Sequence, residues 1–270
     1  METAIRYPAV AGHFYPRNPD DLRAQVTSFF PQEQRPVSAL GCIVPHAGYI
    51  YSGHVAGAVY SVLDLPQRCI IMCPNHTGMG HPLSIMSKGS WETPLGQMTI
   101  DSELAETLKR RFPPLSEDAK AHRAEHAAEV QLPFLQIMKA GCTFVPIALG
   151  TGRYEILEAL GEAMANTLEA LGERVLLIAS SDMNHYENDI ITRQKDHKAI
   201  ERILAMDARG LFDVVMNEHI SMCGVGPTVA MLTAATRLGA TGSELIKYAT
   251  SADISGDRER VVGYAGIITQ

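Results

Sequence analysis

The sequence lacks the features that mark membrane, secreted and nucleic-acid-binding proteins. No apolar run reaches the length needed to span a bilayer, and residues 1–7 carry no basic flank leading into an apolar stretch. The net charge of -7 comes without an acidic or basic block, so nothing offers a polyphosphate backbone an electrostatic footprint. We therefore expect a cytoplasmic protein that binds neither a membrane nor nucleic acid.

Cysteine is scarce, and its count of five is odd. Cys42, Cys69, Cys73 and Cys142 lie in or beside apolar runs typical of strands, so in a reducing compartment we expect buried small hydrophobes and no disulfide framework. The Cys69-x3-Cys73 spacing resembles that of metal ligands. Alternation along a strand, however, puts both side chains on one face inside a core run, which favours burial.

Length and pattern indicate a single α/β domain over residues 1–270, because 46% hydrophobic residues can bury a large core. Strands are expected over residues 40–44, 68–73, 143–149, 175–179, 245–250 and 261–268. Helices are expected over residues 18–30, 53–63, 101–112, 123–140, 154–171, 190–216 (in segments) and 226–238. This alternation predicts a three-layer sandwich with a central mixed, mostly parallel sheet. The long glycine-rich stretch 74–98, with Trp91 near its centre, is expected to be a functional loop.

Histidines follow two of the expected strands. His46 and His76 come just after apolar runs, and a third run ends in a segment containing Asp182 and His185. If these strands share one parallel sheet, their carboxyl ends open on the same crevice, where such sheets place ligands. A histidine that ends a strand is often only a hydrogen-bonded edge residue. The matching positions, each with glycine two residues later, favour a metal or acid-base site.

Three further groups have two interpretations each. Cys223 precedes a helix, whose amino terminus would lower the thiol pKa and favour metal binding or nucleophilic attack; the alternative is an inert thiol. Asp182 and His185 would share one face of a helical turn, with the acid orienting the imidazole, or Asp182 would cap a helix and His185 would face solvent. On the helix expected there, His126 and Glu129 have the spacing of a ligand pair, although such faces are usually solvated.

Several motifs in order resemble the Memo family (mediator of ErbB2-driven cell motility), whose microbial members are called AmmeMemoRadiSam system protein B. They are AGHFYP at 11–16, PHAGYIYSG at 45–53, PNH at 74–76, EHAAEVQLPF at 125–134, SSDMNHY at 180–186 and MCG at 222–224. The resemblance covers nearly the whole chain. It implies a fold similar to class III non-haem iron extradiol dioxygenases and, as partners, radical-SAM and AMMECR1-like system proteins.

The resemblance also implies a site. His46, His76 and Cys223 would surround a metal, with Asp182 and His185 alongside, and Cys223 would stand where the dioxygenases have a carboxylate. A set of two nitrogens and one sulfur suits iron(II) or copper and would also accept zinc.

Three functions remain open at this point. No feature of the sequence identifies the substrate, whether a small molecule or a peptide. We favour a metal-dependent redox enzyme in which His185, oriented by Asp182, moves protons. The second is a non-catalytic metal- or peptide-binding protein that retains the crevice, because eukaryotic relatives are described as binding phosphotyrosine peptides and acting in copper or iron handling. The third and weakest is a hydrolase with Cys223 as nucleophile and His185 as base.

Overall fold

The computed structural model describes residues 4–31 and 36–270, and in much of this chain helices alternate with strands. Residues 1–3 and 32–35 of the expected domain lie outside the described residues. The helices are α1 (Pro19–Ser28), α2 (Tyr49–Ser61), α3 (Ser102–Arg111), the 3-10 helix η1 (Glu129–Gln131), α4 (Leu132–Met138), α5 (Tyr154–Leu171), α6 (Asp189–Leu204), α7 (Ala208–Asn217), α8 (Val225–Arg237) and α9 (Ala252–Ser255). Within the described ranges, no helix is long and apolar enough to cross a membrane.

The strands are β1 (Ile5–Arg6), β2 (Gly41–Val44), β3 (Arg68–Pro74), β4 (Leu83–Ile85), β5 (Ser90–Thr93), β6 (Gly96–Thr99), β7 (Ser116–Glu117), β8 (Thr143–Leu149), β9 (Val175–Ser180), β10 (His185–Glu187), β11 (Ser243–Thr250) and β12 (Val261–Thr269). Nine of them, in the described part of the chain, form one sheet in the order β10-β12-β2-β9-β3-β8-β4-β7, with β11 also paired to β12. A smaller sheet joins β1, β5 and β6.

The centre of the large sheet is parallel. Strand β9 lies between β2 and β3 and is parallel to both, and β3 is parallel to β8. Strands β12 and β4 join this centre antiparallel, so the sheet is mixed and is parallel chiefly in its middle. The carboxyl ends of β2, β9 and β3 therefore meet at one edge, as the sequence predicts.

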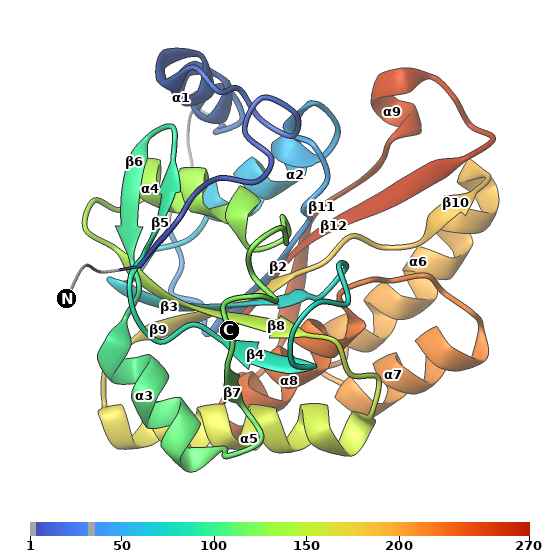
Figure 1. Cartoon of the computed structure of the whole chain (residues 1–270). Coiled ribbons are helices and arrows are strands. Elements are labelled where there is room, and N and C mark those ends of the chain that lie inside the picture. Colours follow the sequence, from blue (N-terminus) through green and yellow to red (C-terminus); the bar gives the residue numbers. More distant parts are fainter. Residues whose placement is uncertain (1–3, 32–35) are drawn as a thin grey trace.

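Helices cover both faces of this sheet (Figure 1). Along β3, Ile70 and Met72 face the core shared with α3, α5, α6, α7 and α8, whereas Cys69, Ile71 and Cys73 face the core shared with α1, α2 and α4. Alternate residues of a strand point to opposite faces, so a strand that is apolar throughout is buried on both sides. The architecture is thus α/β with three layers.

Side-chain caps fix the starts of two predicted helices. The Asn18 Oδ1 atom accepts hydrogen bonds from the backbone N–H groups of Asp20 (2.9 Å) and Asp21 (3.1 Å) at the start of α1. The Asp101 carboxylate caps α3 by accepting from the N–H of Leu104 at 3.1 Å. Each bond satisfies a donor that the first helical turn leaves free, which is why these boundaries were predictable.

The single long loop expected over 74–98 is wrong in its extent: residues 75–82, which carry His76, form a loop, and strands follow it. This stretch contains β4, β5 and most of β6, and Trp91 is fully buried on β5. Its ring meets Phe144 edge-on with a centroid separation of 5.4 Å. The tryptophan is therefore part of the core shared with α1, α2 and α4 and does not belong to an exposed functional loop.

The helix expected over 123–140 is wrong in its first part, because helical structure begins only at η1; from there it continues through α4 to Met138. The buried Glu129 carboxylate forms an ion pair with Arg6 and accepts the N–H groups of Ala9 (2.8 Å) and Val10 (3.1 Å). The hydroxyl of Tyr15 donates to it as well. These contacts with the amino-terminal segment give Glu129 a structural role and remove it from the ligand pair suggested with His126.

Candidate metal centre

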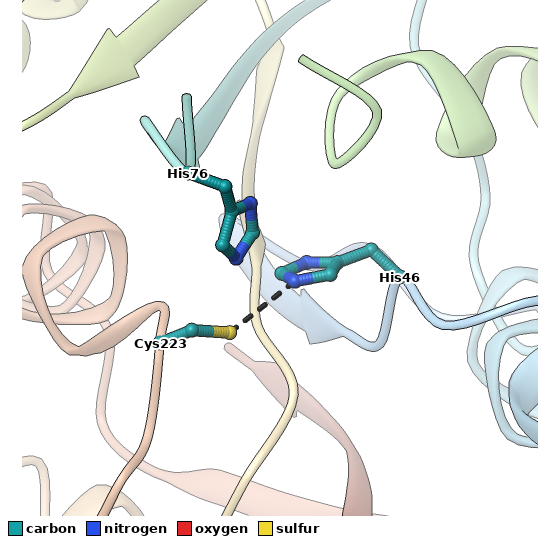
Figure 2. Close-up of side chains that lie close together, drawn as sticks. All are labelled: His46, His76 and Cys223. Atoms are coloured by element: carbon teal, nitrogen blue, oxygen red, sulfur yellow. Dashed lines mark hydrogen bonds between the residues drawn. The ribbon is translucent and has the colours of Figure 1, made fainter. Parts of the chain in front are cut away.

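Three side chains from distant parts of the chain point toward one another at the edge where β2 and β3 end (Figure 2). His46 and His76 each lie two residues beyond their strands, and Cys223 lies just before α8. Their donor atoms all lie within 4.8 Å of one another, and Nε2 of His46 is 3.2 Å from Sγ of Cys223. The structure thus brings together the three residues named from the sequence as a metal site.

A serine at the end of β9 determines which nitrogen of His46 is free. The Ser180 hydroxyl donates to the carbonyl of Ala127 (2.6 Å), so its oxygen accepts from Nδ1 of His46 (3.0 Å) and from Nε2 of Gln131 (2.9 Å). We assign the proton to Nδ1 from this network. Burial, with the neighbouring imidazoles, holds the pKa of His46 well below its usual range, so the ring is neutral and its Nε2 lone pair faces the sulfur.

A buried carboxylate orients His76. Oε1 of Glu125 lies 2.9 Å from Nδ1 of His76, and Oε2 accepts the backbone N–H of the same histidine at 2.6 Å. Burial alone would raise the pKa of Glu125, but the hydrogen bonds and charge of His76 bring it down to about 2. The carboxylate is therefore ionised, Nδ1 donates to it, and Nε2 is left free, which is the arrangement usual for histidines that bind metals.

The Cys223 thiol is less acidic than the sequence predicted. Burial first, and then the charge of Asp182, raise the pKa of this thiol, so the predicted lowering by the start of α8 is wrong. Without a bound cation the group is a thiol, which disfavours the nucleophile interpretation. A coordinated cation reverses this preference, since a coordinating thiol is deprotonated.

Asp182 and His185 lie beside these three residues but not on a helical turn, since His185 begins strand β10. Oδ1 of Asp182 accepts the backbone N–H of His46 at 2.7 Å, and Nδ1 of His185 lies 2.9 Å from the carbonyl oxygen of Ser221. The expected one-turn contact is therefore wrong in its geometry. Asp182 holds the His46 loop, whereas a serine that the sequence did not single out orients the ring of His185.

His126 is a further imidazole in this region. Its ring stacks on that of His76 with centroids 4.9 Å apart and an angle of 18° between the planes, and it lies 5.4 Å from the ring of His46. His76, Glu125 and His126 form a second group whose potential donor atoms lie within 4.8 Å of one another. We favour the set with Cys223, because both oxygens of Glu125 are already engaged by hydrogen bonds.

A family model described as "Memo-like protein" matches residues 6–268. The chain belongs to the Memo-like family. It is 43% identical over 277 aligned residues to a MEMO1 family protein of Methanopyrus kandleri, covering 97% of this chain and 98% of the relative. Similar proteins from Methanothermobacter thermautotrophicus (43%, 97% of this chain and 99% of the relative) and Methanosarcina barkeri (44%, 98% and 100%) match as well. The resemblance drawn from the motifs is confirmed.

The site of this Memo-like chain opens on a cavity of about 550 Å³, whose lining includes Phe14, His126, His185 and Tyr186. The donor set itself tests whether a metal fits there. Both histidines have Nδ1 engaged and Nε2 free, and Cys223 adds a sulfur to the two nitrogens. Such a set would suit iron, copper or zinc.

Proposed function

We propose that this protein is a metal-dependent redox enzyme with a dioxygenase-like site. Nε2 of His46, Nε2 of His76 and Sγ of Cys223 would hold iron(II) or copper, and zinc would also fit. The observation that carries the proposal is the convergence of these donors at the mouth of a cavity, with each imidazole fixed in the tautomer that a metal requires. A bound ion would supply the redox chemistry at its open positions.

The other groups at the site suit proton handling. Nδ1 of His185 donates to the Ser221 carbonyl, so Nε2 is the nitrogen left to accept or deliver a proton in the cavity. Asp182 holds the loop of His46 by accepting the backbone N–H of that histidine. By this proposal His185 is the acid-base residue. Cys223 takes the place that a carboxylate has in class III extradiol dioxygenases, whose fold this chain would share.

A second candidate is a non-catalytic protein that binds a metal or a peptide in the same crevice. Large apolar side chains stand exposed near it: Tyr186 on its lining is 66% exposed, and Ile50 and Tyr51 at the start of α2 are 63% and 37% exposed. Exposed aromatic and aliphatic groups beside a cavity favour contact with a partner.

Oxygen consumption separates the two candidates. The iron-loaded protein would be assayed with a reductant and a panel of phenols, beside the His185→Ala variant. The matched control is His197→Ala, which removes an exposed histidine on α6. Enzyme function predicts consumption above that of free iron, lost in His185→Ala and kept in the control. If the wild type is no faster than free iron, or if His185→Ala equals wild type, the binding protein becomes the better account.

A further inference from the structure

Cys223 lies in the short connection between α7 and α8, where side chains alternate between core and cavity. Ile220 and Met222 are buried in the core, at 4% and 3% exposure, whereas Ser221 and Cys223 line the cavity. Because Ser221 precedes Cys223 by only two residues, the position of Ser221 limits where the sulfur can lie.

Asn184 holds Ser221 in place through two hydrogen bonds. Its Oδ1 accepts both the backbone N–H and the hydroxyl of Ser221, each at 3.0 Å. Its Nδ2 donates to Oε2 of Glu187 (2.7 Å) and to the hydroxyl of Thr192 (3.3 Å). Asn184 is fully buried, with donors facing its oxygen and acceptors facing its nitrogen, so the orientation of the amide is fixed.

Ser221 in turn accepts two hydrogen bonds from His185. Its hydroxyl oxygen accepts the backbone N–H of His185 at 2.7 Å, and its carbonyl accepts the Nδ1 proton at 2.9 Å. One residue therefore sets both the tautomer of the candidate acid-base histidine and the course of the chain toward the candidate sulfur ligand.

We propose that Asn184 and Ser221 are positioning residues that couple the orientation of His185 to the placement of Cys223. The proposal rests on the proposed function, because it assigns His185 and Cys223 their roles. Loss of the Asn184 amide frees two donors of Ser221. The segment then opens more often, the Nδ1 contact weakens, and His185 samples both tautomers.

The test uses the full-length protein without added metal and then with iron(II). Nitrogen-15 NMR of the histidine rings reports the tautomer of His185, a property that a general loss of stability does not change. The alkylation rate of Cys223, mapped by mass spectrometry, reports local opening, and that of the fully buried Cys42 reports global unfolding. In Asn184→Ala we expect mixed tautomers and an alkylation rate of Cys223 raised by about tenfold or more, because two hydrogen bonds to Ser221 are lost. Cys42 should be unaffected.

A paired exchange supplies the rescue. In Asn184→Asp with Glu187→Gln, the new carboxylate still accepts from Ser221 and takes a hydrogen bond from the new amide, so the wild-type tautomer and alkylation rate should return. Glu187→Gln alone is the matched control and should resemble wild type, because its amide oxygen can still accept from Asn184.

Wild-type values of both readouts in folded Asn184→Ala would overturn the coupling. If that variant does not fold, Ser221→Ala decides: it removes only the hydroxyl contacts, and an unchanged His185 tautomer and Cys223 rate would overturn the proposal equally. Failure of the wild type to bind iron(II), copper or zinc would defeat the proposed function instead. The two readouts taken without metal would still report on the coupling.

Discussion

The Glu125→Gln substitution tests how far one buried carboxylate controls the candidate metal centre. Oε1 of Glu125 accepts from Nδ1 of His76 (2.9 Å) and from the N–H of Ala127 (3.0 Å), and Oε2 accepts the N–H of His76 (2.6 Å). All three partners are donors. Whichever way a glutamine amide turns, its NH₂ group faces another N–H, and the negative charge behind His76 is lost.

The expected loss in metal affinity follows from this geometry. Removing the carboxylate makes Nε2 of His76 a weaker electron-pair donor to a metal and leaves the ring less firmly held. In metal sites such a change typically costs about 10- to 100-fold in metal affinity. That range corresponds to about 1.4–2.7 kcal/mol of binding free energy.

The dependence on pH gives the prediction a sign. Burial lowers the pKa of His76, but the hydrogen bond and charge of Glu125 outweigh it and raise the pKa above its usual value. Metal binds the neutral ring, so wild-type affinity falls as the pH drops through this raised pKa. Without the carboxylate the pKa is lower and the proton competes less. The deficit of the variant should therefore be greatest near pH 8 and smaller near pH 6.

Anaerobic competition titrations with iron(II) or zinc at both pH values would measure this deficit. Glu218→Gln, at a surface ion pair with Lys198, is the control and should bind as wild type. Circular dichroism would establish that both variants are folded. Equal affinities for Glu125→Gln and wild type at pH 8, or a deficit that grows as the pH falls, would refute the reasoning.

Three more substitutions probe the other contacts. Ser180→Ala removes the acceptor that holds the Nδ1 proton of His46 and should weaken metal binding about 10- to 100-fold; unchanged binding in the same titration would contradict the assigned tautomer. Glu129→Ala leaves Arg6 buried without its partner and should lower the free energy of unfolding by about 3–5 kcal/mol in urea titrations, whereas a loss under about 1 kcal/mol would argue against a structural role. His185→Ala should keep its metal and lose about 100- to 10,000-fold in oxygen consumption; loss of the metal itself would make His185 a ligand instead.

The strands and the edge that carries the site were predictable from local patterns. The runs at 68–73 and 143–149 are apolar from their second residue onward, and the run at 175–179 is apolar throughout. They correspond to β3, β8 and β9 within one residue at each end. Buried parallel strands have such continuous apolar runs because both faces of the sheet are covered. His46 and His76 follow from the same logic, since chain direction alone puts them at one edge.

The partners of those histidines were not predictable in the same way. Glu125 was expected on a helix, and its contact with His76 spans 49 positions of the sequence. Ser180 and Asn184 lie in the SSDMNHY motif and Ser221 lies in none of the motifs, but the sequence assigned none of them a role, because their roles depend on which groups the fold brings within reach. The acidity of Cys223 was mistaken for a related reason: the sequence shows the start of α8, but not the burial that outweighs it.

The metal content of anaerobically purified protein tests the central claim most directly. Elemental analysis with an electron paramagnetic resonance spectrum would identify the ion in the wild type and measure its occupancy in His46→Ala, His76→Ala and Cys223→Ala. We expect stoichiometric iron or copper in the wild type and a sharp loss in each variant with the fold retained, because two protein donors hold a labile divalent ion poorly. Stoichiometric metal in all three variants would contradict the assignment of these residues as ligands.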